Sequence, residues 1–538
     1  MIIRYRAMDT MLGILFFFLA LSLSPFLSLS LLTRVVEETM YLKFEKKLLF
    51  LFLYSFLTKF EVNFEKKMGD SSKLSHEEQL EKVKEICQAF VLTNEQLHTI
   101  KESFLSEIQK GLKKESNNTA SIKCWPTYVH EFPTGCEYGM FLVVEVGGSN
   151  FRISCIHLKG PRDYSANKES FDLSMQLQSG NVDNIFDRIT DSLYKFLKDN
   201  DLLREPLALT LCLSYVLFNT SLNTAVIKDF TKDVYVQRLL NRNVVTLLQD
   251  AIERRKGLRV TVVAVLNDCT AALLCSNRFG NDCSISVMVG STCNAVYVEN
   301  ADEIELFESE KSDGIKCMVV DTLWGDFGSN GHLDAITTEF DKQLDEVSSN
   351  VGKHKFVKMT AGYYMGELVR QVFASCIEKG ILFEGNTSSI LSTPFKFMSH
   401  HISTMLSEED NSYDHMRLIF DKLGITQPPD NECAKAHYIM NTITQRSAHL
   451  VACGIASLME KINQKHIGVA MGGGFYSKTR IYKDLVEKKL KELLGESRTF
   501  EIKSKEGSVA VGSALLAAMS TRSEFLFESD EMKTHFPC

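Results

Sequence analysis

The chain has 538 residues and a formal net charge of −8, so it is long enough for two or three domains with large cores. Its hydrophobic content of 45% and charged content of 24% are ordinary for a globular protein, and the negative balance without a basic stripe argues against nucleic-acid binding. The 14 cysteines are scattered, with no Cys-x-x-Cys pair and no Cys/His cluster, which argues against zinc and favours a reduced, cytoplasmic protein.

Residues 1–67 form an apolar N-terminal extension. Residues 11–33 carry no charge and are long enough to cross a bilayer, and two arginines precede them. Three interpretations stay open: a signal peptide on a secreted chain, an anchor that gives membrane association, or a mistaken start upstream of the true start at Met68. Secretion would open three Asn-x-Ser/Thr sites to glycosylation, namely Asn117, Asn219 and Asn386.

The first elements after this extension are two helices and a hairpin. Residues 76–113 carry apolar side chains at helical spacing, and Asn94 can open the second helix. Residues 141–158 read as a β-branched strand, a tight turn of small polar residues and a second strand. The pattern then predicts a helix, a buried strand, a helix and a β-branched strand, over residues 182–203, 207–215, 234–255 and 258–266.

A second hairpin and a largely helical half complete the chain. Residues 285–299 repeat the strand–turn–strand design of residues 141–158, which suggests two related half-domains facing one another. Beyond them the pattern predicts helices over 333–462, clearest at 356–381 and 434–462, a strand over 466–471, and helices over 481–494 and 508–519. Strands that alternate with helices indicate the α/β class.

The two hairpin turns have the composition of an anion cradle. Glycine lets backbone N–H groups approach a ligand, and neighbouring hydroxyl and amide side chains add donors. A plain β-hairpin is the alternative for either turn taken singly. The glycines at 472–474 do not begin a P-loop, because no glycine precedes Lys478-Thr479 at the spacing which that motif needs. Small residues after Gly507 open the last helix, where close packing is the commoner explanation.

Asp268 is the first candidate for chemistry. It follows the C-terminal end of a hydrophobic strand, where open α/β sheets place their ligands, and a carboxylate there can take a proton from a hydroxyl. The alternative is that the Asn267-Asp268 pair caps the next helix. Lys232, which follows Thr231 in a loop-like stretch, can neutralise phosphate or can be a solvated surface lysine.

Glu367 lies within an apolar helical pattern, where a carboxylate without partners is costly. The residues leave two interpretations open. Glu367 is either paired with Arg370 three residues later or bonded to a ligand, and the pair is the more common arrangement.

Taken in chain order, seven segments resemble motifs of the hexokinase family in its single-unit animal form, over residues 80–519. EVGGSNFR resembles the family's DLGGTNFR, GSTCNAVYVE resembles GTGCNAAYVE, and DTLWGDFGSNGHLD resembles NTEWGAFGDNGSLD. The other segments resemble SFPxxxTSL, TKGF, VNDT and KMxSGMYLGELVR, at residues 214–222, 231–232, 266–268 and 359–370.

The resemblance implies an α/β protein with the actin-like, duplicated ribonuclease-H-like fold of two domains around an interdomain cleft. It places N-terminal helices and a small domain at 76–275, a large domain at 276–520 and a tail at 521–538. The implied activity is ATP-dependent phosphorylation of a glucose-like hexose at its 6-hydroxyl, which feeds glycolysis. ATP and Mg²⁺ are the implied cofactors, and closure around the sugar would exclude water.

The resemblance also implies residue roles. Asp268 would be the general base, and Lys232 would act beside it. The implied sugar contacts are Ser214, Thr231, Lys232, Asn267, Asp268, Asn294 and Glu367. The implied nucleotide contacts are Gly147, Gly148, Ser149, Asn150, Arg152, Gly290, Ser291, Gly473 and Ser508.

Several positions depart from the family motifs. The substituted residues are Glu145 for Asp, Val216 for Pro, Asp233 for Gly, Thr292 for Gly, Leu323 for Glu, and Gly472 and Gly474 in a turn that reads Asp-Gly-Ser in the family. Each change removes a ligand donor or adds bulk or charge near the expected site. The alternative to a working kinase is therefore a weak or inactive relative that binds sugar or regulates.

Overall fold

The computed structural model describes residues 74–528 apart from 149, 162, 174–180, 232–236, 279–282, 311–313, 408–411 and 505–506. The apolar extension predicted over residues 1–67 lies outside the described residues. Within the described part, no helix combines the length and the apolar character needed to cross a bilayer.

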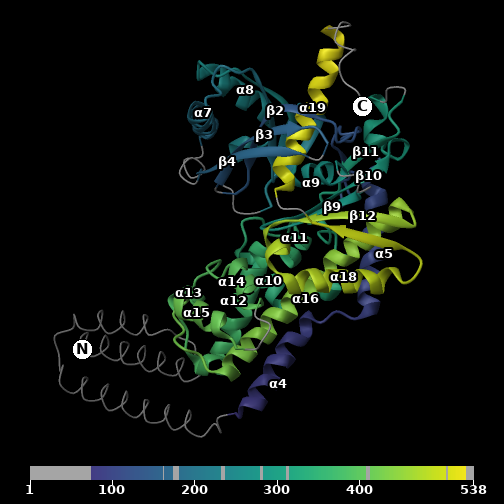
Figure 1. Cartoon of the computed structure of the whole chain (residues 1–538). Helices are drawn as coiled ribbons and strands as arrows, with labels where there is room; N and C mark the ends of the chain where they lie inside the picture. The colour runs from purple at the N-terminus through teal and green to yellow at the C-terminus, as the bar shows by residue number, and fades with distance from the viewer. Residues whose placement is uncertain are drawn as a thin grey trace, which may run out of the picture. The chain divides into compact units, whose positions relative to one another are not determined.

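A five-stranded sheet is built from the first half of the chain (Figure 1). Its order is β4 (Tyr164–Asp172), β3 (Asn150–Lys159), β2 (Tyr138–Val146), β5 (Leu207–Leu213) and β8 (Val260–Leu266). The predicted first hairpin is confirmed as β2 and β3, which pair antiparallel with Glu145 opposite Arg152. Strands β2, β5 and β8 run parallel, so their carboxyl ends meet at one edge of the sheet.

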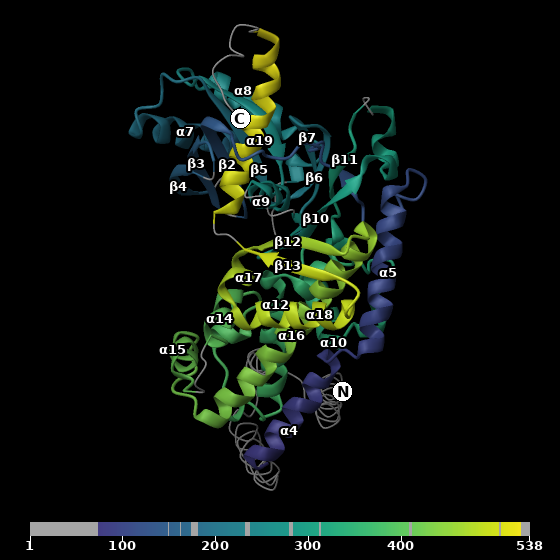
Figure 2. The same cartoon turned by 45° about the vertical axis from the view of Figure 1, so that its right-hand side comes forward.

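Both faces of this sheet are covered by helices. Leu142 and Val144 share a buried cluster with α7 (Val182–Asp199) and α8 (Val244–Arg254), whereas Phe141 and Val143 pack with α19 (Ser508–Glu528). Successive strand side chains point to opposite faces, so the alternation along β2 separates the two layers. Figure 2 shows α19 alongside the strands of this sheet, and the separate buried clusters place it on the face opposite α7 and α8.

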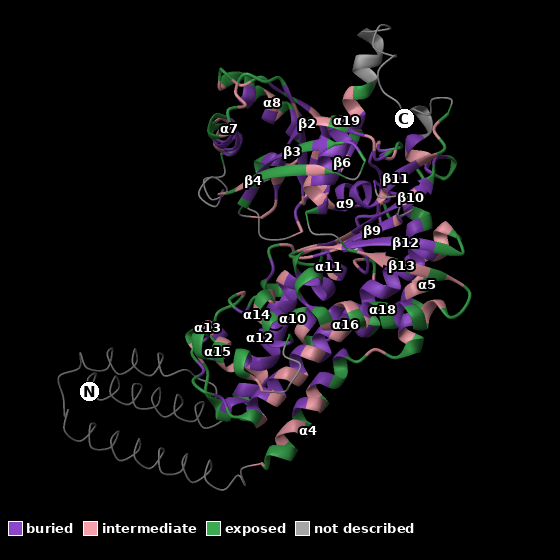
Figure 3. Cartoon of the chain, viewed as in Figure 1, coloured by how far each residue is buried: buried purple, intermediate pink, exposed green. Residues whose placement is uncertain are grey.

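Five strands from the second half of the chain and the short β1 from the first half form a six-stranded sheet with a related plan. Its order is β1 (Trp125–Pro126), β11 (Cys317–Asp321), β10 (Cys293–Asn300), β9 (Cys283–Val289), β12 (His466–Gly472) and β13 (Thr499–Lys503). An antiparallel hairpin, β9–β10, again adjoins parallel strands, since β9, β12 and β13 run parallel. Strands β9 and β12 are buried along most of their length (Figure 3), as expected of strands covered on both faces.

One helix lies between the two sheets. α9 (Asp268–Asn277) starts where β8 ends, and its buried side chains share a cluster with residues of β8, β9, β12 and α19. It carries eight buried residues out of ten, which explains its lack of a polar face. The first residues of α9 are therefore held at the junction between the two sheets.

The remaining helices pack mainly around α16 (Asp430–Ile462), whose residues are largely buried. α5 (Asn94–Leu112) and α18 (Arg480–Leu494) pack against it, and α5 begins at the predicted Asn94 with Thr93 as its cap. The other helices are α4 (His76–Cys87), α10 (Glu339–Val347), α11 (Lys355–Thr360), α12 (Gly362–Glu378), α13 (Ser389–Ser392), α14 (Ser399–Met405), α15 (Asp414–Lys422) and α17 (Gly474–Lys478).

The structure differs from the predicted elements in several places. Strands β1, β4, β11 and β13 are not among the predicted elements. The hairpin of β6 (Val216–Ser221) and β7 (Thr224–Asp229) lies where no strand was expected. The single helix expected over 356–381 is broken into α11 and α12, because Ala361 is extended and the Gly362 N–H donates to Gly290 O (2.8 Å). α19 falls in the range expected for the large domain but packs on the five-stranded sheet, while the domain boundary near residue 275 remains a prediction.

Two of the three potential glycosylation sites are inside the fold. The Asn117 side chain donates to Gly111 O and Lys123 O, and Asn219 donates to Val265 O. Both asparagines are 7% exposed, so a glycan on either would displace packed structure. These two asparagines are therefore unsuited to carry a glycan in the folded chain, whichever interpretation of residues 1–67 holds.

Candidate active site

The carboxyl ends of β2, β5 and β8 bring three polar segments together. Ser214 follows β5, and its N–H donates to Val146 O at the end of β2 (3.2 Å). Its hydroxyl donates to Asp268 Oδ2 (3.0 Å), and the Cys269 N–H donates to Asp268 Oδ1 (2.9 Å). The capping role weighed for the Asn-Asp pair belongs to Asn267, whose Oδ1 accepts from the Thr270 N–H (2.7 Å). Asp268 does not take the capping role, and its carboxylate lies beyond the carboxyl end of β8.

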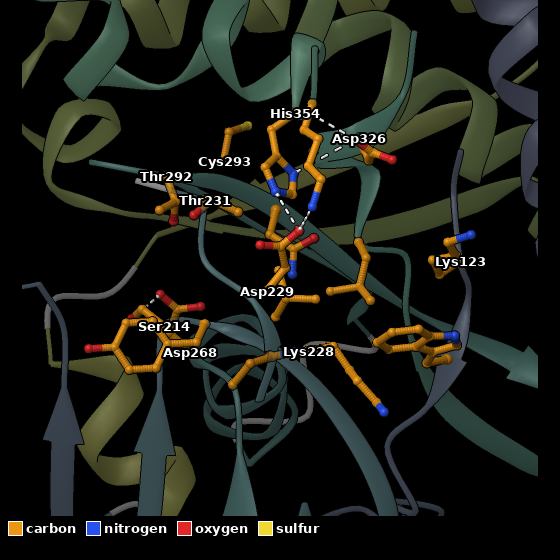
Figure 4. A pocket seen from close by; sticks show the side chains of 18 residues that line it. Lys123, Ser214, Lys228, Asp229, Thr231, Asp268, Thr292, Cys293, Asp326 and His354 are labelled. Atoms are coloured by element: carbon orange, nitrogen blue, oxygen red, sulfur yellow. Dashed lines mark hydrogen bonds and ion pairs between the residues drawn. The ribbon is translucent and has the colours of Figure 1, made fainter. Parts of the chain in front are cut away.

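A cavity of about 280 Å³ opens beside Asp268 (Figure 4). The structure brings to it five of the residues predicted to contact sugar: Ser214, Thr231, Asn267, Asp268 and Asn294. They come from both sheets, because Asn294 lies in β10 and the others lie in or after strands of the first half. Lys232 lies outside the described residues, so its role as second catalytic residue remains a prediction.

The innermost part of the site contains a buried carboxylate that sequence reasoning missed. Asp321, at the end of β11, is 3% exposed and accepts hydrogen bonds from Asn267 Nδ2 (2.6 Å) and Asn294 Nδ2 (2.8 Å). Burial raises the pKa of Asp321 to about 7, although the bonds that it accepts work in the opposite direction. A signal was available, since the family motif NTEWG begins with Asn where this chain has Asp321.

The rim of the cavity carries a cluster of charges from two parts of the chain. Lys353 Nζ lies 2.9 Å from Asp229 Oδ2, and the half-turn before α11 places His354 Nε2 3.5 Å from the same oxygen. Burial would raise the pKa of Asp229, but His354, Lys353 and the Phe230 N–H more than offset it and hold the pKa below its ordinary value. Figure 4 shows His354 and Asp229 meeting across the cavity from Asp268. They connect the β6–β7 hairpin to the start of α11.

Apolar side chains line the cavity between these polar groups. Trp125, Tyr215, Val216 and Leu323 all border it. Leu323 is 8% exposed and has a positive φ of 50°, and its N–H donates to Asp321 Oδ1 (3.2 Å). The departure from Glu to Leu therefore replaces a carboxylate by an apolar wall. Such walls with a few fixed polar groups are typical of small-molecule sites.

Glu367 is not among the residues that line this cavity, and its predicted contact with sugar remains a prediction. Its carboxylate is fully buried and accepts from Arg370 Nε (2.8 Å), Arg370 Nη2 (2.6 Å) and the Phe395 N–H (2.5 Å). The Gln371 side chain adds a fourth donor at 3.3 Å. The ion pair with Arg370, weighed as the alternative, is what the structure contains.

The turn of the second hairpin packs against the glycines after β12. Gly290 lies close enough to Gly473 and Gly474 that an added Cβ would meet the Gly474 nitrogen at 3.4 Å. Gly473 has a φ of 97°, and a Cβ there would lie 2.4 Å from Val289 O. Since β9 and β12 are parallel neighbours, these turns share one sheet edge. They form a backbone-lined surface that side chains would block.

The turn of the first hairpin is described in part. Gly147 N–H donates to Asn150 O (3.1 Å), while Ser149 lies outside the described residues. Glu145 pairs with Arg152 at 3.4 Å, and burial raises the pKa of Glu145 despite that partner. All nine predicted nucleotide contacts, Gly148, Ser291 and Ser508 included, remain predictions.

Two family models, both described as hexokinase, match the chain over residues 82–278 and 284–519. The chain belongs to the hexokinase family. It is 30% identical over 453 residues to Hexokinase-1 of Mus musculus, a match that covers 83% of this chain and 46% of that protein. The chain thus spans about half the length of this curated relative. Hexokinase type 1 of Drosophila melanogaster is 27% identical over 84% of this chain and 96% of its own length.

A solved hexokinase structure supports the same assignment for the fold. The hexokinase from Schistosoma mansoni complexed with glucose matches with a TM-score of 0.77 and 27% identity, covering 83% of this chain and 100% of that one. The predicted α/β class and the duplicated actin-like ATPase fold are confirmed. In this hexokinase-family chain the cavity beside Asp268 lies where elements of the two sheets converge.

Proposed function

We propose that this protein transfers the γ-phosphoryl group of ATP to the 6-hydroxyl of a glucose-like hexose, a step that feeds glycolysis. The observation that carries this proposal is the Asp268 carboxylate, which borders the cavity at the end of β8. Membership of the hexokinase family supports the same reaction class. The glucose bound in the Schistosoma mansoni relative supports a hexose as the substrate.

In the proposed reaction, Asp268 is the general base. The 6-hydroxyl gives its proton to the Asp268 carboxylate, its oxygen forms a bond to the γ-phosphorus, and the bond from that phosphorus to the ADP oxygen breaks. Ser214 and the Cys269 N–H hold the carboxylate in place through hydrogen bonds of 3.0 and 2.9 Å. We assign Lys232 to neutralise charge on the transferred group.

The nucleotide is proposed to bind at the two hairpin turns. Gly290 in the second turn and Gly473 after the neighbouring strand β12 present backbone without side chains. Arg152 supplies a cation whose side chain is 49% exposed. Mg²⁺ would enter bound to the ATP phosphates, as part of that substrate. Backbone N–H groups and a guanidinium suit phosphate oxygens because both donate hydrogen bonds and neither needs to lose a proton.

Two contacts support closure of the site around the sugar. Lys353 pairs with Asp229 across the rim, and the Tyr364 hydroxyl donates to Thr231 O (2.7 Å). Each joins the helical half of the chain to the segment that carries Thr231. A closed rim would exclude water from the transferred phosphoryl group, which limits hydrolysis of ATP.

A second candidate is a sugar-binding relative with little or no turnover. The observation that favours it is the first turn, where Glu145 replaces the family Asp and is engaged by Arg152. A longer carboxylate tied to the cation proposed for phosphate would disturb the phosphate site and leave the sugar cavity intact. The same side chains can therefore bind sugar without reacting.

A coupled assay for glucose 6-phosphate separates the two candidates. We expect turnover by the full chain at millimolar sugar and ATP, and a loss of about 10²–10⁴-fold in kcat for Asp268→Ala, with the melting temperature nearly unchanged. Sugar binding measured by calorimetry without turnover would leave only the second candidate. Unchanged turnover in Asp268→Ala would overturn its role as base.

A further inference from the structure

The Asp321 carboxylate acts only as a hydrogen-bond acceptor among the described residues. Its Oδ2 accepts from Asn267 Nδ2 (2.6 Å), and its Oδ1 accepts from Asn294 Nδ2 (2.8 Å) and from the Leu323 N–H (3.2 Å). A deprotonated carboxylate is acceptor-only and satisfies all three N–H donors. An amide or a protonated acid at this position would instead place a donor of its own opposite one of them. The Asp321 carboxylate therefore fixes the Nδ2 group of each asparagine amide toward itself.

The two asparagines differ in how firmly they are held. Asn267 is fixed at both ends, because its Oδ1 also accepts from the Thr270 N–H at the start of α9. Asn294 is oriented through its Nδ2, and its Oδ1 is buried without a partner among the described residues. Asn294 borders the cavity. A buried carbonyl oxygen without a donor is costly, so a ligand that donates there gains affinity.

We propose that Asp321 is a positioning residue that directs the Asn294 carbonyl to the sugar, so that this site selects a hydroxyl that donates a hydrogen bond to Asn294 Oδ1. The inference rests on the proposed function, since it takes a hexose as the occupant of the cavity. Asp321 acts through Asn294 and does not itself touch the sugar. The residue is a departure of this chain from the Asn of the family motif.

The charge on Asp321 makes this orientation depend on pH. Burial raises the pKa of Asp321 to about 7, and the neighbouring Asp268 charge acts in the same direction. A proton on Oδ1 would face Asn294 Nδ2, so the amide must rotate and present its NH₂ to the cavity. The other titratable groups that act on Asp321 are the thiols of Cys269 and Cys124, and burial raises the pKa of both thiols further above neutrality.

The test measures glucose affinity of the full chain by calorimetry without nucleotide, from about pH 5.5 to about pH 8.5. We expect affinity to fall at least about threefold between pH 8 and pH 6, as one favourable hydrogen bond is lost. Asp321→Asn should bind at the weak level throughout and show no pH dependence. Its KM for sugar should rise at least about threefold while kcat stays within about twofold, because Asp268 keeps its own partners.

Thr322→Val is the matched control, since it removes a buried hydrogen bond to Ala295 O (2.7 Å) next to Asp321 without touching either asparagine. It should lower stability and keep the pH profile of sugar affinity. If Asp321→Asn does not fold, Asn294→Ala replaces it, and this variant should also lose the pH dependence.

The outcomes separate this inference from the proposed function. If the wild-type chain phosphorylates sugar but its glucose affinity does not change with pH, the role of Asp321 is overturned and the proposed function is not. A pH dependence that persists in Asp321→Asn or Asn294→Ala also overturns it, because Asp268 or another group would be its source. A pH-dependent affinity that both variants lose supports the role of Asp321, and absence of turnover in the same chain would overturn only the kinase activity.

Discussion

Glu367→Gln tests whether a buried carboxylate on α12 serves the fold or the sugar. In the structure its oxygens are fully buried and take two hydrogen bonds from Arg370, at 2.8 and 2.6 Å. Glutamine keeps the shape but removes the charge, so the guanidinium, whose side chain is 10% exposed, stays buried without a counter-ion. Breaking a buried ion pair in this way costs about 3–5 kcal/mol, a large part of the roughly 5–15 kcal/mol that stabilises a typical domain.

The assay is urea-induced unfolding followed by circular dichroism, together with the KM for glucose under conditions where the variant is folded. We expect a clearly lower unfolding midpoint and a KM within about twofold of the wild-type value. Glu81→Gln is the control, because Glu81 forms the same i,i+3 pair with Lys84 at an exposed position, and its midpoint should not shift measurably. A wild-type midpoint combined with a KM raised at least about tenfold would refute this reasoning and return Glu367 to the sugar site.

Two further predictions address the nucleotide surface and the rim. Gly473→Ala should raise the KM for ATP and lower stability by about 1–3 kcal/mol, because its φ of 97° is unfavourable for alanine and the new Cβ would lie 2.4 Å from Val289 O; a KM for ATP equal to that of wild type would count against a cradle there. Asp229→Asn removes the ionic contact with Lys353, whose side chain is 60% exposed, and alters the 3.5 Å contact with His354. Sugar release in stopped-flow fluorescence should therefore accelerate, by no more than about fivefold. A decrease in the release rate would contradict the proposed closure.

The sequence was sufficient for the elements that depend on local patterns. The hairpins around Gly147 and Gly290 are signalled by β-branched runs and tight turns, and α5 begins at Asn94 as its periodicity and capping residues indicate. The strand that ends before Asn267 is equally visible, and its end places Asp268 at the cavity. These features are encoded within a few residues, and local propensity and burial act on the same segments.

The β6–β7 hairpin and the break at Ala361 could not be predicted in this way. The hairpin alternates weakly and contains polar residues, and it is held by pairing with a partner segment. The break depends on Gly362, whose N–H reaches Gly290 more than seventy residues earlier in the chain. Contacts between segments this far apart leave no periodic signal in either one.

The sequence by itself determined the fold family, through seven motifs in chain order. It also determined the two glycine turns and the position of Asp268 after a strand, because each of these is written in a short contiguous motif. Only the tertiary structure decided that Glu367 belongs to Arg370 and that Asp321 joins Asn267 to Asn294. The physical reason is that a carboxylate accepts hydrogen bonds from the donors that surround it in space. For Asp321 two of these donors, Asn267 and Asn294, lie far from it in the chain.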